Sequence, residues 1–362
     1  MAFTEKNLAA LIKAAFENCA SDIHIREGET PCFRIQGELI PIQTKEFSHE
    51  HIVSICEILS KNHGNNIDLL SFGEHDGSYS VKGFCRLRYN IFKYQRKIGI
   101  TLRIINENIP TIEALGLPNI LKKIALKERG LVLVTGATGS GKSTTLAAMI
   151  DYINNKQSCH IISIEDPIEY LHPQINSRIT QREVNIDTEN FSFGLKSALR
   201  QDPDVIFIGE LRDTETITTA LKAAETGHIV FSTVHTTDCI ATIGRIIAMF
   251  PLDEQKEVRK RLAENLYSTI SQRLLKRHDK KGMIAAFEIM ITTPGIRECI
   301  EGKESVNNIL KILREGKNKN DLQSQSFDQH IMELYQKGKI SKTTAINSAT
   351  SQSDFLLNLQ IN

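Results

Sequence analysis

One glycine-rich turn constrains this chain more than any other segment: Gly136-Ala137-Thr138-Gly139-Ser140-Gly141-Lys142-Ser143-Thr144. The apolar run of residues 131–134 precedes it, and residues 144–150 continue with the composition of a helix. A phosphate-binding loop requires this order of strand, turn and helix, because the glycines let backbone N–H groups point inward and the helix adds the positive end of its dipole. The turn therefore predicts a binding site for a triphosphate.

Two side chains of the turn have predicted roles. Lys142 can reach the β- and γ-phosphates as a point charge, and the Ser143 hydroxyl can ligate Mg²⁺. The alternative is a glycine-rich turn that binds nothing. The agreement of the full pattern with its strand-to-helix context argues against that alternative.

Length and composition narrow the class of protein. The 362 residues exceed what one hydrophobic core usually supports, so we expect two domains. A formal net charge of +1 gives no overall attraction to nucleic acid or acidic membranes. The seven cysteines are scattered without any Cys-x-x-Cys pair, which favours a reducing compartment over a zinc site. Since we find neither an apolar run of roughly 18 residues nor a signal peptide, we expect a cytoplasmic protein that meets a membrane only through partners.

Residues 1–111 are predicted to form a small α+β domain. Apolar spacing predicts helices over 4–18 and 51–59. Alternation predicts a strand over 21–25, two strands around Gly37 within 32–41, and three strands within 78–105, over 79–81, 84–90 and 98–105. Polar residues and a proline at 106–111 interrupt both patterns and mark the predicted boundary.

Residues 112–362 are predicted to form an α/β domain. Apolar strands at 160–164, 204–208 and 229–233 alternate with helices at 191–200 and 213–226. This alternation predicts a mainly parallel sheet, which presents its ligands at the carboxyl ends of its strands. Beyond Pro251 we expect a helix over 253–276, a polar linker over 314–325 and two helices within 326–351.

Acidic side chains follow two of these strands. Glu165, Asp166 and Glu169 follow the first, where a carboxylate can orient or deprotonate the water that attacks the γ-phosphate. We expect Glu165 to have that role, and a solvated acidic loop is the alternative. Residues 204–210 have the form of a Walker B segment, so we expect Glu210 to bind the Mg²⁺ shell through water.

Two histidines flank the strand at 229–233. His235 lies at its carboxyl end, which makes it a candidate for sensing the γ-phosphate. For His228, at the other end, a catalytic and a structural role agree equally well with the sequence. Their spacing across a strand does not suggest a metal pair, so zinc is not expected.

Four segments together resemble the Walker A motif, Asp box, Walker B motif and His box of the secretion ATPases, the superfamily of type II secretion and type IV pilus motors. In that order they are residues 136–145, 164–170, 199–213 and 226–237. The resemblance implies a RecA-like P-loop domain with a smaller N-terminal α+β domain of PAS-like type, and ATP with Mg²⁺ as cofactors. It also implies a homohexamer that works with an inner-membrane platform protein.

Members of this superfamily supply arginines from the N-terminal domain to the nucleotide. The matching strands carry Arg86, Arg88, Arg96 and Arg103, of which we favour Arg88 and Arg103. An arginine delivered as subunits close neutralises charge on the γ-phosphate. For each of them, a place on an exposed strand face is the alternative.

Within the superfamily the chain looks most like the pilus retraction ATPases. This implies a motor that couples ATP hydrolysis to domain rotation and drives retraction in twitching motility. The chain begins almost at the shared domain and lacks the four-cysteine module typical of assembly motors. The retraction signature Ala-Ile-Arg-Asn-Leu-Ile is altered at residues 295–300 to Gly-Ile-Arg-Glu-Cys-Ile, so an accessory retraction motor, an assembly motor and a secretion motor stay open as alternatives.

A nucleic-acid-binding RecA-like translocase is the alternative from a different class. The near-neutral charge and the lack of a basic stripe interleaved with aromatic residues count against it. The one local basic concentration is expected to be a solvated helix face; it comprises Arg259, Lys260, Arg261, Arg273, Lys276 and Arg277.

Overall fold

The computed structural model describes residues 3–35, 37–60, 73–81, 85–105, 109–279, 282–316 and 324–361. The chain divides into two compact units, one of residues 1–108 with 169–171 and one of residues 109–168 with 172–362. The predicted boundary at residue 111 lies close to this division. It stays a prediction, because residues 106–108 lie outside the described part of the chain.

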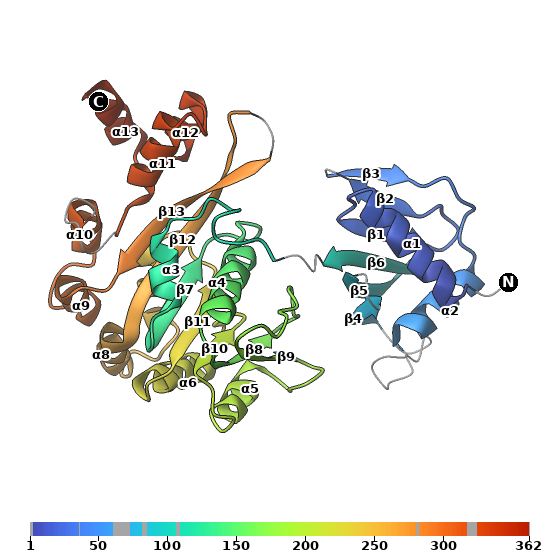
Figure 1. The fold of residues 1–362 in the computed structure, drawn as a ribbon, viewed down its shortest axis with the longest axis horizontal. Coiled ribbons are helices and arrows are strands. Elements are labelled where there is room, and N and C mark those ends of the chain that lie inside the picture. The colour runs from blue at the N-terminus through green and yellow to red at the C-terminus, as the bar shows by residue number, and fades with distance from the viewer. Residues whose placement is uncertain are drawn as a thin grey trace. The chain divides into compact units, whose positions relative to one another are not determined.

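The first unit is an antiparallel sheet with two helices packed on it (Figure 1). The strand order is β3-β2-β1-β6-β5-β4. The strands are β1 Asp22–Arg26, β2 Cys32–Ile35, β3 Glu38–Pro41, β4 Glu74–Val81, β5 Cys85–Tyr94 and β6 Lys97–Ile105. The helices α1 (Glu5–Glu17) and α2 (His49–Ser60) bury apolar stripes such as Leu8, Ile12 and Ile52 against the sheet. The predicted α+β character is confirmed, although Phe84 of the predicted strand lies outside the described residues.

The second unit contains a seven-stranded sheet of order β13-β12-β7-β11-β10-β8-β9. Every neighbouring pair is parallel except β12 with β13. The strands are β7 Gly130–Thr135, β8 His160–Glu165, β9 Arg178–Glu183, β10 Val205–Ile208, β11 Ile229–Val234, β12 Leu266–Lys276 and β13 Met283–Ile291. Since parallel strands share a direction, β7, β8, β10 and β11 end at one edge of the sheet.

Helices cover both faces of this sheet (Figure 1). They are α3 Ile120–Ala125, α4 Lys142–Lys156, α5 Phe191–Ala198, α6 Thr214–Glu225, α7 Cys239–Ala248 and α8 Gln255–Asn265. Leu131 and Leu133 of β7 join the core under α6, α7 and α8, whereas Val132 and Val134 join the core under α3 and α4. Successive strand residues point to opposite faces, so a strand buried on both sides is apolar throughout.

The predicted helix over 253–276 is wrong in its second half. Helix α8 ends at Asn265, and the following residues form β12 between β7 and β13. Side chains such as Ser268, Thr269 and Ile270 are buried, because small or β-branched residues fit a strand that is covered on both faces. The predicted basic helix face is wrong for the same reason, since Arg273 and Lys276 lie on β12.

Five helices follow β13 in the described residues: α9 Pro294–Glu301, α10 Asn308–Gly316, α11 Phe327–Gln336, α12 Lys342–Ser348 and α13 Gln352–Ile361. Helices α11 and α12 are the two predicted within 326–351. Part of the predicted linker is helical through Gly316, and its residues 317–323 lie outside the described part. Among described residues, no helix combines the length and apolarity needed to cross a bilayer.

Candidate nucleotide-binding site

The glycine-rich turn joins the end of β7 to the start of α4. Gly136, Gly139 and Gly141 have φ values of +148°, +77° and +88°, in the region that favours glycine. A Cβ at Gly136 would lie 2.5 Å from the carbonyl oxygen of Gln272, so this position also needs glycine for space. The turn thus has the backbone form of a phosphate-binding loop, with the amino end of α4 beside it.

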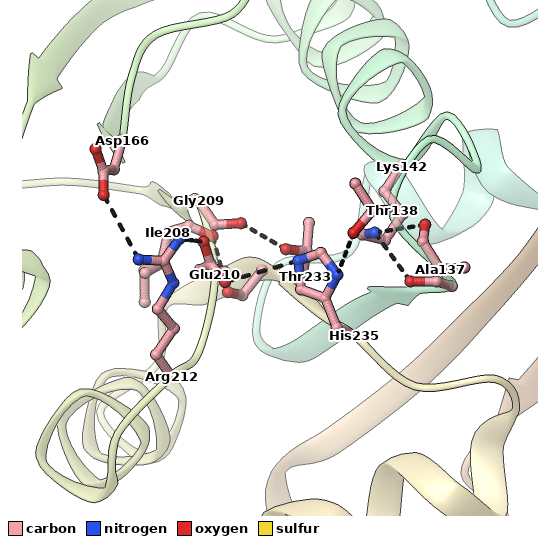
Figure 2. A network of polar contacts seen from close by, with 12 residues as sticks. Ala137, Thr138, Lys142, Asp166, Ile208, Gly209, Glu210, Arg212, Thr233 and His235 are labelled. Carbon is pink, nitrogen blue, oxygen red and sulfur yellow. Dashed lines mark hydrogen bonds and ion pairs between the residues drawn. The ribbon is translucent and has the colours of Figure 1, made fainter. Parts of the chain in front are cut away.

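Lys142 lies inside the loop, because its Nζ donates to the carbonyls of Gly136 (2.9 Å) and Ala137 (3.0 Å) (Figure 2). The side chain is buried, and Ser143 and Thr144 continue the first turn of α4. This arrangement places the ammonium group among the loop's own backbone groups, where it faces any phosphate that the loop binds.

A line of polar contacts connects this loop to the predicted Walker B acid (Figure 2). His235 approaches Thr138 with Nδ1 3.5 Å from the hydroxyl oxygen, and its Nε2 lies 3.7 Å from a carboxylate oxygen of Glu210. The hydroxyl of Thr233 donates to the carbonyl of Gly209 (2.7 Å), which fixes the end of β10 against β11. The structure therefore brings Thr138, His235 and Glu210 together, as expected from strands ending at one edge.

His235 is suited to a role as a neutral contact. Burial lowers its pKa, the charge of Lys142 lowers it further, and the opposing effect of Glu210 does not reverse the direction. The neutral ring dominates at pH 7, so one ring nitrogen donates while the other accepts.

Arg212 was not predicted, although it stands within the Walker B segment. Its guanidinium pairs with the Glu210 carboxylate, and Nη1 lies 3.7 Å from an oxygen of Asp166. Figure 2 shows Arg212 between the two acids, so a single cation joins the segments that follow β8 and β10. No sequence signal marked this role, because Asp166 and Arg212 meet only in the folded sheet.

Glu165 is the last residue of β8 and is buried. One carboxylate oxygen accepts from the Ser163 hydroxyl (2.6 Å) and from the side-chain amide of Gln181 (3.1 Å). The Gln181 amide oxygen in turn accepts from the backbone N–H of His172 (2.9 Å). Glu165 is thus held at the same sheet edge as Glu210, one strand farther from the loop, and its role toward water stays a prediction.

His228 lies at the opposite end of β11 from the loop, just before the strand begins. Its Nδ1 is 3.0 Å from the Ala223 carbonyl oxygen and 3.2 Å from the Thr226 hydroxyl oxygen, at the end of α6. Within its own chain His228 does not join the other predicted residues. These contacts favour the structural alternative over a catalytic role at this loop.

Arg88 and Arg103 lie directly opposite each other on β5 and β6 in the first unit. Arg103 Nε donates to Asp22 (2.8 Å). Burial acts to raise the pKa of Asp22, but hydrogen bonds from Arg103 and Ser21 outweigh it and hold that pKa below its usual value. Arg103 is therefore held through the Nε of its guanidinium group, although its side chain stays largely exposed.

Arg86 and Arg96 of this unit differ from these two in their contacts and backbone conformation. Arg86 donates to the Ser78 hydroxyl (2.8 Å), and Arg96 occupies the turn between β5 and β6 with a φ of +62°. The transfer of any arginine of this unit to a nucleotide stays a prediction.

A cavity of about 900 Å³ opens beside the loop. Gly141, Thr144 and Thr145 line one wall, and residues 113–120 with Leu274 and Ile284 line the others. Its place next to the first turn of α4 suits the nucleoside part of a nucleotide whose phosphates lie in the loop.

The oxygen donors near the loop suit Mg²⁺, which shares its ligands with phosphate and water, better than a metal ion that the protein binds through its own side chains alone. Among the described residues, no three His, Cys, Asp or Glu side chains converge. Mg²⁺ at nucleotide sites keeps several waters and takes one or two protein ligands with phosphate oxygens. Ser143, at the start of α4, and Glu210, close to the loop through His235, stay the predicted contributors.

Comparison with known proteins places this geometry in a family. Residues 1–355 match the family described as type II/IV secretion system protein. The chain belongs to that family. It is 42% identical over 349 residues to the type IV pilus retraction ATPase PilT of Pseudomonas aeruginosa, covering 96% of this chain and 100% of the relative. It is 38% identical over 352 residues to the type IV pilus ATPase PilU of the same organism, covering 97% and 91%.

The fold agrees with this assignment. The crystal structure of the pilus retraction motor PilT with bound ADP superposes with a TM-score of 0.86 at 40% identity, covering 95% of this chain and 97% of that one. The predicted resemblance to secretion ATPases, with N-terminal and RecA-like domains, is confirmed.

Proposed function

We propose that this protein is an ATPase motor that retracts type IV pili, acting as a homohexamer on an inner-membrane platform partner. The observation that carries the proposal is the phosphate loop, linked to Glu210 through His235, in a chain of which 96% matches the PilT retraction ATPase.

Each residue of the site has a defined part in the proposed reaction. The loop N–H groups and Lys142 bind the β- and γ-phosphates, and the cavity beside Thr144 takes the nucleoside. Mg²⁺ at Ser143 would add positive charge beside the phosphates. Glu165 orients the attacking water, and Glu210 holds the outer water shell of the site. Neutral His235 donates a hydrogen bond toward the γ-phosphate and loses this contact when phosphate leaves.

Arg88 and Arg103 supply the link to movement in this proposal. An arginine stabilises the charge that develops on the γ-phosphate only when it is apposed to the nucleotide. Hydrolysis then depends on closure between domains, and phosphate release favours reopening. This dependence converts a chemical step into domain rotation.

Deletion of the gene distinguishes retraction from the other motor functions. A retraction motor predicts cells with surplus, immobile pili that have lost twitching, whereas bald cells would identify an assembly motor. Complementation with the wild-type gene restores twitching, and complementation with the Lys142→Ala gene does not.

The altered signature of residues 295–300 favours one second candidate, an accessory retraction motor like PilU. This segment forms α9, in which Cys299 is buried and Glu298 is exposed. An accessory motor predicts that the deletion strain keeps twitching at low load and that this gene alone does not rescue a strain without its main retraction motor.

A further inference from the structure

Gln272 joins the phosphate loop to the strand beside it. It lies on β12, which pairs with β7, and its side chain is only 3% exposed. Its amide Nε2 donates to the backbone carbonyl of Ser140 (2.7 Å), and its Oε1 accepts from the Thr145 hydroxyl (2.7 Å). The buried Gln272 amide therefore bonds to the loop through its nitrogen and to the first turn of α4 through its oxygen.

The loop is shaped to receive this residue. A Cβ on Gly141 would lie 2.9 Å from the Gln272 Nε2, and a Cβ on Gly136 would lie 2.5 Å from its backbone oxygen. Two of the loop glycines thus give space to residue 272 in addition to their positive φ values. The contact is a close packing of backbone against side chain and leaves little freedom to the loop.

Strand β12 and its partner β13 are tied to the C-terminal helices. The Arg273 guanidinium carbon lies 3.9 Å from the centre of the Phe327 ring of α11, and Arg273 Nη1 donates to the Ser348 carbonyl of α12 (3.2 Å). Phe287, the cross-strand partner of Gln272, donates its N–H to His330 Nδ1 of α11 (3.0 Å). Contacts with α11 and α12 therefore also hold the strand that carries Gln272.

We propose that Gln272 is a positioning residue that holds the phosphate loop in its anion-binding form. In a trans peptide the C=O and the following N–H point in opposite directions, so fixing the Ser140 carbonyl toward β12 directs the Gly141 N–H away from that strand, toward the loop interior. This preorganisation strengthens phosphate binding without any contact to the reacting atoms. The inference rests on the nucleotide-binding role proposed for the loop.

Gln272→Met tests it, since Met keeps the volume and removes both hydrogen bonds. Two lost buried hydrogen bonds predict a Kd for Mg·ADP, measured by calorimetry, that rises on the order of ten- to a hundredfold. The KM for ATP rises with it, and kcat changes by less than about threefold, because ground-state and transition-state binding fall together. Thr145→Val removes one bond and gives a smaller rise, and its effect disappears in the Gln272→Met background.

Thr269→Val is the matched control on the same strand. The Thr269 hydroxyl is buried and has no hydrogen-bond partner among the residues that the structure describes, so this variant should keep wild-type nucleotide affinity. A thermal shift by pyrophosphate should shrink in Gln272→Met while the shift by adenosine persists, because positioning acts on the phosphate part. A folded Gln272→Met protein with wild-type Kd would overturn the proposal.

If Gln272→Met does not fold, Gln272→Asn decides, because it keeps a neutral amide but shortens the side chain by one methylene, which withdraws the amide from Ser140 and Thr145. An unchanged Kd in that variant refutes the proposal, and a rise of about tenfold supports it. Lys142→Ala distinguishes failure of the proposed loop function from failure of the positioning role. If Lys142→Ala binds and hydrolyses ATP normally, the loop does not have the proposed function. If only the Gln272 variants bind nucleotide normally, the positioning role alone is refuted.

Discussion

The positions and partners of some side chains at the sheet edge could be predicted from the sequence, and those of others could not. Glu210, His235 and Lys142 stand in motifs of fixed order, so their meeting followed from parallel strands ending together. Arg212 and Gln272 could not be assigned in this way, because their partners come from segments about 45 and 130 positions away that only the fold brings close. Polar residues of this kind carry no local pattern before their partners are known.

Glu165→Gln tests the predicted role toward water. The amide keeps the size of the side chain and the contact with Ser163, but it does not accept a proton, so kcat should fall on the order of a hundredfold or more. Binding of Mg·ADP should stay within about threefold of wild type. Glu169→Gln, at an exposed acid in the same segment, is the control and should keep its turnover; equal kcat values for both variants would contradict the assignment.

His172 predicts a pH-dependent stability. Within the described part of the chain its buried ring Nδ1 has no hydrogen-bond partner, and burial lowers the pKa of His172 from 6.5 to about 4. Between these values the unfolded chain binds the extra proton, so the free energy of unfolding falls as the pH falls. We expect wild type to lose about 1 to 2 kcal/mol more than His172→Gln between pH 7 and pH 5 in urea titrations. Equal losses would show that His172 does not titrate in this way.

At the scale of elements, amphipathic helices and alternating strands were predictable, and buried strands late in the chain were not. Helix α6 begins after the Asp213 cap and ends before Gly227, as its sequence indicates. Strand β12 was mistaken for helix because a strand buried on both faces lacks alternation, and only its pairing with β7 and β13 identifies it.

The backbone form of the loop between β7 and α4 predicts that its glycines differ in how well they tolerate alanine. Gly136→Ala meets both a φ of +148° and a backbone oxygen at 2.5 Å. Gly139→Ala meets only the positive φ, because no atom of the described residues other than its chain neighbours lies within 4 Å of the new Cβ. We expect Gly136→Ala to abolish detectable ADP binding and Gly139→Ala to weaken it by about tenfold or less, at a strain of about 1 kcal/mol. Titration calorimetry checks both, and equal affinities would refute the steric argument.

At the scale of the whole molecule, the proposed motor requires a ring. Light scattering should give a mass of six times 40.7 kDa, about 244 kDa, in the presence of Mg·ADP. The reason is that the action proposed for the arginines of the N-terminal unit requires subunits to be apposed. A protein that stays monomeric at all nucleotide concentrations would contradict this.

The central claim is that this glycine-rich loop binds ATP for hydrolysis, and steady-state ATP turnover of the purified Lys142→Ala protein tests it most directly. Lys142 is buried among the loop carbonyls, so its loss removes the one ammonium group placed toward the phosphates in the described residues of the loop. The account predicts a folded protein with the circular dichroism spectrum of wild type and no measurable phosphate release. Turnover equal to wild type would contradict it.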